Sequence, residues 1–232
     1  CHGIQTIFAT LPSLIAVMLA WVSQFLYVAG QCGIFAFFIT YILDRNHTPA
    51  LSERVVEYFP ADMCQQFDGG WFISKGCSPY MLSLAFLLFA IGRFSGSAIQ
   101  RRCAPHRVLG LYASINIVLM LLVIANLGWL SVIALILSFF FMSIMYPTNF
   151  ALGIRGLGVK TKLAASFMVT AIIGGAVMPW CMGRIIDHYG WSVGFVMPLV
   201  CFLFIAFYGY TWSKWYAHDT AGPAEPPVPA GH

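Results

Sequence analysis

Charged residues are scarce in this sequence. Only 12 Lys and Arg and 8 Asp and Glu occur among 232 residues, a charged fraction of 9%, whereas a soluble domain has about 25%. The mean hydropathy is +0.82. The sequence therefore excludes an ordinary soluble protein and indicates an integral membrane protein. Six windows are long enough to cross a hydrocarbon core of about 30 Å as helices: residues 14–42, 80–100, 109–127, 132–152, 163–183 and 193–212.

The predicted spans also lack carboxylates and histidines. Ionisable side chains at membrane depth are costly and are usually functional, but the six windows contain no Asp, Glu or His and only one charged residue, Arg93. No metal cluster, nucleophile and base pair or phosphate-binding loop can be assembled from the residues of these spans. These absences argue against an intramembrane enzyme and a self-contained proton pump, and we expect no bound cofactor.

The loops divide the sequence into three parts. Residues 1–12 form a short N-terminal segment, and residues 13–213 form a six-helix bundle with a long acidic loop at 44–79. Residues 214–232 form a tail rich in Pro and Ala, which we expect to be disordered. Basic residues are more frequent in the loops on the side of the termini, and the positive-inside rule places that side in the cytoplasm. We expect a multi-pass protein of the cell membrane, the inner membrane in a bacterium, with both termini cytoplasmic. The basic residues are too scattered to predict a nucleic-acid partner.

The cysteines give two further indications. The chain begins with Cys1 rather than Met and shows no signal peptide, so we expect that sequence upstream of Cys1 is missing. Cys64 and Cys77 both fall in the acidic loop, where a disulfide can form if that face is oxidising. Their spacing alone leaves the disulfide open.

Neutral polar residues form a stripe on the first predicted span. Gln24, Tyr27 and Gln31 recur at i, i+3 and i+7, which places two amides and a phenol on one helical face. Such groups suit a ligand made of hydroxyl groups. For each residue alone, hydrogen bonding between helices is the more frequent role and is worth about 0.6 kcal/mol per contact. Three such residues on one face favour a binding site.

The fourth predicted span contains the stretch SIMYPTNFALG, residues 143–153. Pro147 has no amide hydrogen to bond the carbonyl of Ser143, so we expect the helix to bend or open there as a hinge. Tyr146 and Asn149 flank this break and are candidates for substrate binding. A plain packing kink is the alternative.

Arg93 lies in the stretch AIGRFSG, seven residues before Gln100. That separation is about 10 Å along a helix. The guanidinium could face a polar cavity, as a gating or cavity charge, or reach the cytoplasmic surface. We favour the cavity.

Three stretches keep the order and spacing of a known family: GRFSGSAIQRRCAPHRVL, FFFMSIMYPTNFALGIRGLG and SFMVTAIIGGAVMPWCMGRIIDHYG. They resemble successive parts of the C-terminal half of L-fucose:proton symporters, in the major facilitator superfamily. The stretch QFLYVAGQCG resembles the first helix of that half. The resemblance implies an all-α, polytopic membrane protein. Its six transmembrane helices form the C-terminal half of a twelve-helix fold, with sugar bound between the halves near the midplane.

The resemblance also implies roles for the candidate residues. Tyr146 matches a cavity tyrosine of the family, and Gln24, Tyr27 and Gln31 match the cavity face of its seventh helix, while Asn149 is a weaker match. The proton-coupling carboxylates of that family belong to the N-terminal half. The resemblance thus implies that the proton is the coupling ion. It also implies that a missing N-terminal six-helix half is a partner of this chain.

Three positions depart from the family. Gln100 stands where the family's cytoplasmic loop motif has an aspartate, so a charge pair that latches the inward face is missing or rebuilt. Met145 and Ala165 stand where polar neighbours of the site are expected, which puts L-fucose itself in doubt. We expect proton-coupled uptake of L-fucose or a related hexose by alternating access, with a small-molecule sugar and the lipid bilayer as partners. A non-transporting sugar sensor and a fragment that is inactive alone are the alternatives.

Overall fold

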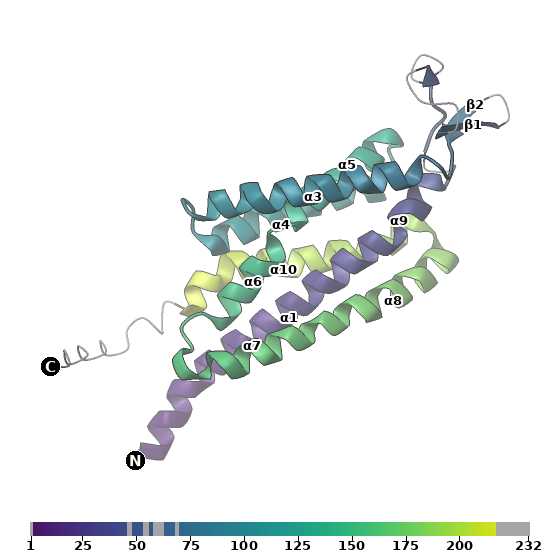
Figure 1. The fold of residues 1–232 in the computed structure, drawn as a ribbon. Coiled ribbons are helices and arrows are strands. Elements are labelled where there is room, and N and C mark those ends of the chain that lie inside the picture. Colours follow the sequence, from purple (N-terminus) through teal and green to yellow (C-terminus); the bar gives the residue numbers. More distant parts are fainter. Residues whose placement is uncertain (1, 46–47, 53–55, 58–62, 68–69, 217–232) are drawn as a thin grey trace.

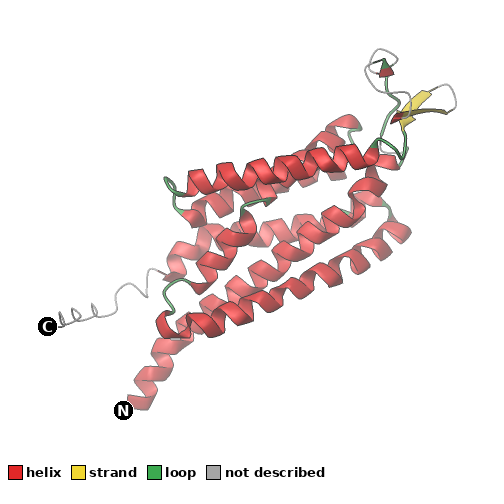
Figure 2. Cartoon of the chain, viewed as in Figure 1, coloured by secondary structure: helices red, strands yellow, loops and turns green. Residues whose placement is uncertain are grey.

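The computed structural model describes residues 2–45, 48–52, 56–57, 63–67 and 70–216. They form a bundle of long helices with a small two-stranded hairpin at one end (Figures 1 and 2). Within this described part, six helical stretches are long and apolar enough to cross a membrane, which confirms the six predicted spans. Their bounds are Ile15–Leu43, Ser78–Gln100, Pro105–Ile124, Trp129–Ile154, Thr161–Tyr189 and Trp191–Lys214.

Three of the spans are assembled from more than one helix. The first three coincide with or lie within single helices, whereas the fourth and fifth are interrupted and the sixth begins with a short helical turn. The elements are α1 (His2–Leu43), α3 (Ser78–Gln100), α4 (Pro105–Ile124), α5 (Trp129–Met142), α6 (Met145–Ile154), α7 (Thr161–Thr170), α8 (Gly174–Tyr189), α9 (Trp191–Gly194) and α10 (Val196–Tyr216), with 3₁₀ turns at Gly158–Lys160 and Ala171–Ile173.

The two ends of the chain differ in part from the expectation. The described part of the segment 1–12 is helical and continuous with the first span, because α1 begins at His2. Residues 214–216 of the expected tail belong to α10. The rest of that tail and Cys1 lie outside the described residues.

The long helices pack side by side in the order α8, α1, α10, α4, α5, α3. The helices α8 and α3 therefore form the two edges of the bundle. Burial follows this order, since half or slightly more of the most apolar stretch is buried in each inner span, but only 17% in the α3 span and 28% in the span of α7 and α8. In Figure 1 the hairpin lies at one end of the bundle, and the start of α1 and the end of α10 lie at the other.

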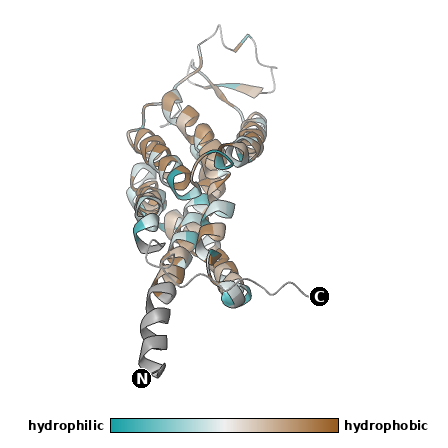
Figure 3. Cartoon of the chain, turned by 90° about the vertical axis from the view of Figure 1, so that its left-hand side faces the viewer, coloured by the Kyte–Doolittle hydropathy of each residue, from teal (hydrophilic) through white to brown (hydrophobic). Residues whose placement is uncertain are grey.

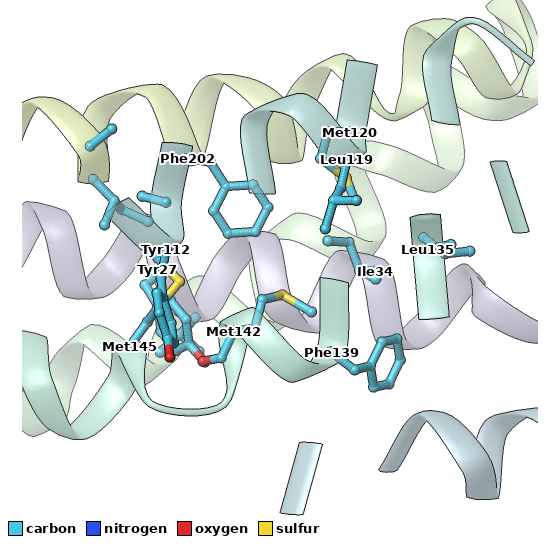
Figure 4. Close-up of a cluster of buried hydrophobic side chains, with 14 of the residues drawn as sticks. Tyr27, Ile34, Tyr112, Leu119, Met120, Leu135, Phe139, Met142, Met145 and Phe202 are labelled. Carbon is cyan, nitrogen blue, oxygen red and sulfur yellow. The ribbon is translucent and has the colours of Figure 1, made fainter. Parts of the chain in front are cut away.

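Apolar residues occur along most of the helices (Figure 3). Large apolar side chains are exposed on the bundle as well as buried in it, as expected where lipid is the solvent. Its core is a continuous cluster with contributions from α1, α4, α5, α6 and α10 (Figure 4). Small residues of the fifth span pack tightly against α1, because a Cβ on Gly174 would lie only 2.5 Å from the carbonyl oxygen of Phe25.

The acidic loop contains two strands that the sequence did not predict. β1 (Cys64–Phe67) and β2 (Gly70–Ile73) pair antiparallel, with Cys64 opposite Ile73 and Phe67 opposite Gly70. Four-residue strands are too short for a clear alternating pattern, so the sequence did not distinguish them from loop. A hydrogen bond also joins this loop to the bundle: the indole Nε1 of Trp129 on α5 donates to the carbonyl of Pro49 at 3.1 Å.

Candidate functional site

The fourth span is interrupted at Ser143 and Ile144, between the end of α5 at Met142 and the start of α6 at Met145. This position is one turn before Pro147. Because proline has no amide hydrogen, it cannot bond the carbonyl four residues earlier, which belongs to Ser143. The helix is thus interrupted at the carbonyl that the proline leaves free. That Pro147 serves as a hinge stays a prediction.

Side chains from two other spans bond the carbonyls at this interruption. The hydroxyl of Tyr27 on α1 donates to the carbonyl of Met142 at 2.7 Å. Nε and Nη2 of Arg93 on α3 both lie 3.4 Å from the carbonyl oxygen of Ser143 and donate to it. Lipid offers no hydrogen-bond donors, so a broken helix persists in a membrane only where neighbours supply them.

A third carbonyl is bonded from within α6. The hydroxyl of Thr148 donates to the carbonyl of Ile144 at 2.6 Å. The side-chain amide Nε2 of Gln100, at the end of α3, donates to the same Thr148 hydroxyl oxygen. Gln100 is the position where the resembled family has an aspartate, and here it makes a neutral contact with the fourth span.

Helix α3 reaches the interruption through two glycines spaced four residues apart. A Cβ on Gly92 would lie 2.4 Å from the carbonyl oxygen of Phe140, and one on Gly96 would lie 2.8 Å from the Cβ of Ile144. Glycines at this spacing allow helix backbones to approach closely in membranes. Arg93 follows Gly92 directly, so the close approach carries its guanidinium to the carbonyl of Ser143.

Arg93 is exposed on the surface of the described bundle, apart from its contacts with the interruption. Its guanidinium carbon lies 5.1 Å from the centre of the Phe89 ring, one turn earlier on α3. Whether this surface lines a transport cavity stays a prediction.

Two tyrosines meet beside the interruption. The ring centres of Tyr27 and Tyr146 lie 6.1 Å apart, with their planes inclined at 58°. Tyr27 is fully buried and Tyr146 is half-buried. Figure 4 draws Tyr27 in the same cluster as Met142, whose carbonyl its hydroxyl bonds. Gln31, one turn further along α1, is also half-buried.

The other two candidates, Gln24 and Asn149, have no accessible surface. Among the described residues, neither the nitrogen nor the oxygen of either side-chain amide has a hydrogen-bond partner. The structure therefore brings Tyr27 and Tyr146 together, leaves Gln31 and Arg93 within reach of a ligand, and encloses Gln24 and Asn149 inside the bundle.

Sequence reasoning missed two polar residues in this region. Thr148 bonds the interruption, and Ser23 is fully buried with a hydroxyl that has no partner among the described residues. Thr148 could have been found, because a Thr four residues after a carbonyl commonly bonds it within a helix. Ser23 carried no such signal.

A cavity of about 720 Å³ lies elsewhere, between the hairpin and the ends of α3 and α5. Most of its lining is apolar and includes Met63, Ile73, Leu84 and Ile133. Such a surface offers few hydrogen bonds to the hydroxyl groups of a sugar, so the cavity is no part of the candidate sugar site.

Cys64 and Cys77 line that cavity as free, buried thiols. Burial raises the pKa of both thiols, and the neighbouring Cys64 contributes to the raised pKa of Cys77. Within the described ranges, no three His, Cys, Asp or Glu side chains are grouped so that they could hold a metal ion.

The chain is similar in sequence and structure to known sugar transporters. The chain is 35% identical to the L-fucose-proton symporter of Escherichia coli (strain K12) over 187 residues, which are 80% of this chain and 37% of that protein. It is 36% identical to a glucose/galactose transporter of Brucella abortus biovar 1 (strain 9-941) over 124 residues, which are 53% of this chain and 30% of that protein. The crystal structure of an E. coli fucose:proton symporter variant superposes with a TM-score of 0.72 at 32% identity, and covers 85% of this chain and 43% of that one.

A second crystal structure, of a major facilitator superfamily transporter in the outward conformation, gives a TM-score of 0.71 at 33% identity. It covers 86% of this chain and 43% of that one. The chain is thus similar in sequence and in fold to L-fucose-proton symporters of the major facilitator superfamily. The resemblance and the predicted fold class, six helices forming the C-terminal half of this fold, are therefore confirmed.

The chain spans less than half the length of each of these relatives. No model of a protein family matches it. The relatives are transporters and not enzymes, which agrees with the prediction from the sequence.

Proposed function

We propose that this chain is one six-helix half of a transporter that takes up L-fucose or a related hexose with protons by alternating access. The observation that supports this most is the interrupted fourth span, bonded by Tyr27 and Arg93 and flanked by the Tyr27–Tyr146 pair. Interrupted helices near the midplane form the substrate sites of many secondary transporters. The names of the relatives, L-fucose-proton symporters and glucose/galactose transporters, support a sugar as substrate.

The accessible residues of the site have suitable chemistry. Tyr146 and Gln31 are half-buried, so their hydroxyl and amide groups can reach a ligand beside the bundle. A phenol and an amide each offer a donor and an acceptor, which is what a sugar hydroxyl needs. In this proposal Tyr146 and Gln31 bind the hydroxyl groups of the sugar as it enters the site. Arg93 is a charge at the edge of the cavity, and Pro147 is the hinge of the fourth span.

In this proposal the coupling proton belongs to a second, N-terminal half of the transporter. The six predicted spans contain no carboxylate or histidine that could carry a proton at membrane depth. The exposed faces of α3 and α8 are suitable surfaces for that half, because little of either edge span is buried within the chain. We place the protein in the cell membrane with both termini in the cytoplasm, following the distribution of basic residues.

Uptake of labelled L-fucose by the complete transporter, driven by a proton gradient, tests the proposal. Glucose and galactose should be tried as competitors. We expect Tyr146→Phe and Gln31→Ala to raise the sugar concentration for half-maximal uptake about tenfold, the change for one lost hydrogen bond. Tyr80→Phe is the control, because Tyr80 is 65% exposed and lies beside the apolar cavity. Unchanged uptake in both site variants would remove these residues from the site, and absence of sugar counterflow in the native protein would contradict transport.

A further inference from the structure

The contacts between α1 and α6 define a seam with a regular register. A Cβ on Gly153 would lie 2.8 Å from the Cβ of Ala20, and the Tyr146 ring lies 6.1 Å from that of Tyr27. Going forward along α1 from residue 20 to residue 27 therefore means going backward along α6 from residue 153 to residue 146. The two helices run antiparallel in this seam.

Gln24 and Asn149 occupy the layer between these two contacts. Gln24 comes four residues after Ala20 and three before Tyr27, while Asn149 comes four residues before Gly153 and three after Tyr146. Residues at these spacings share one helical face. The two amides thus lie at the same level of the seam, and both have no accessible surface.

Neither amide is used within the described structure. All four side-chain nitrogen and oxygen atoms of Gln24 and Asn149 lack a hydrogen-bond partner among the described residues. Leaving a buried amide unsatisfied is costly, so native proteins keep few such groups and those are often functional. Helix packing, the alternative role for Gln24, would require a hydrogen bond that this seam does not contain.

Helix α6 is also joined to its neighbours in a way that permits movement. It has ten residues and begins at the interruption of the fourth span. Beyond its end at Ile154 come Gly156 and Gly158, with φ angles of 77° and 50°, a conformation that favours glycine. The interruption lies at one end of α6 and the two glycines lie beyond the other. A short helix between two such flexible segments can tilt as a unit, because residues at the ends of elements absorb most of the backbone change in hinge motions.

We propose that the Gln24–Asn149 layer is a second, concealed part of the sugar site, which opens when α6 tilts and then binds sugar hydroxyls. The inference rests on the proposed function, which assigns the sugar to the neighbouring Tyr146. The inference adds to that function a second step: Gln24 and Asn149 do not contact the sugar when it first binds at Tyr146, but only after α6 has tilted. In the closed seam they destabilise the bundle, and a polyhydroxyl ligand satisfies them.

The test measures thermal unfolding of the complete purified transporter with and without saturating L-fucose. Gln24→Leu and Asn149→Leu keep similar volume and remove the unsatisfied groups. We expect each variant to unfold a few degrees higher than the native protein without sugar. We also expect each to lose most of the stabilisation that sugar gives to the native protein.

Asn116→Leu is the matched control. Asn116 is a fully buried amide on α4 whose Nδ2 donates to the carbonyl of Tyr112 at 3.0 Å, while its Oδ1 has no partner among the described residues. Because this amide is half satisfied and lies outside the seam, we expect this variant to gain less stability than the two seam variants and to keep the sugar-induced shift. A native protein without any sugar-induced shift, or Leu variants that keep the full shift, would overturn the inference. A native protein that shows the shift but gives no counterflow would overturn transport and leave the concealed sugar site standing.

Discussion

The hydroxyl of Tyr27 links the first span to the interruption of the fourth across 115 residues of sequence. Removing it in Tyr27→Phe leaves the carbonyl of Met142 without this donor. We expect a loss of about 1 kcal/mol in the free energy of unfolding. Hydrogen bonds between membrane helices stabilise a protein somewhat less than buried hydrogen bonds do in water-soluble proteins. Equilibrium unfolding in mixed micelles measures this loss.

Tyr80→Phe is the comparison for this substitution. Tyr80 is 65% exposed, so Tyr80→Phe should leave the unfolding free energy unchanged. An equal loss in Tyr27→Phe and Tyr80→Phe would contradict the importance of the bond to Met142.

The thiols of Cys64 and Cys77 should react slowly with iodoacetamide at neutral pH. Burial disfavours the thiolate and raises the pKa of both groups, and only the thiolate reacts. Because these are acids with raised folded-state pKa values, their contribution to stability is present below the ordinary thiol pKa and is lost as pH rises through the raised one. We therefore expect alkylation to accelerate, and stability to fall, on the alkaline side of the ordinary thiol pKa.

Mass spectrometry of the alkylated protein between pH 7 and pH 10 checks this pH dependence. Cys103 lies exposed in the turn after α3 and reports the reagent's activity in the same sample. Rapid labelling of Cys64 and Cys77 at pH 7 would contradict their burial. Labelling that requires prior reduction would instead show that the two thiols form the disulfide that their shared loop permits.

At the scale of an element, the interruption between α5 and α6 depends on both Pro147 and its side-chain partners. Pro147→Ala restores an amide hydrogen that can bond the carbonyl of Ser143 and continue the helix. Because Arg93 already bonds that carbonyl, the gain is well below the full cost of a proline in a helix, and we expect about 1 kcal/mol. We expect uptake to slow, since a continuous helix tilts less easily at this point.

Hydrogen exchange of residues 143–149 and initial uptake rates together check the effect of Pro147→Ala. Pro179 is the matched control, because it lies within the uninterrupted helix α8. Pro179→Ala should change stability without slowing uptake. Faster exchange at residues 143–149 in Pro147→Ala would show that the helix has not become continuous.

The elements were predictable to different degrees for physical reasons. A membrane span is a local property of about 20 apolar residues, so all six could be predicted from the sequence. The break could also be expected, because the effect of Pro147 reaches only four residues back. The bond from Arg93 to Ser143 spans 50 residues, and a local pattern does not reveal such a pairing.

The stripe on α1 shows the same limit within the site. Its period places Gln24, Tyr27 and Gln31 on one face, but a period does not say what that face meets. The structure turns it toward α6, so Gln24 and Tyr27 are fully buried while Gln31 is only half-buried. The difference arises from the packing of α6, whose position the sequence of α1 does not contain.

At the scale of the whole molecule, the bundle is unevenly covered. The edge helix α3 carries exposed apolar side chains, among them Leu87 at 56% and Phe94 at 80%, and α8 carries Trp180 at 64%. Lipid can cover such residues, and so can another group of helices. The Arg93 side chain, exposed on the same helix as Phe94, favours a protein or aqueous cavity over lipid on that side, since a charge facing lipid is costly.

A two-part reconstitution tests whether α3 and α8 meet a second bundle. We expect the 232-residue chain alone in liposomes to give no proton-driven fucose uptake, and uptake to appear when the N-terminal half of the same transporter is expressed beside it. Phe94→Lys should then weaken copurification of the two halves, because it places a charge in the contact. Leu111→Lys is the control, because Leu111 is exposed near the start of the inner helix α4. A lysine there can extend to the lipid headgroups or to solvent, so copurification should stay intact. Uptake by the chain alone would contradict the assignment of the proton site to a second half, because the six spans predicted from the sequence contain no carboxylate or histidine that could carry a proton.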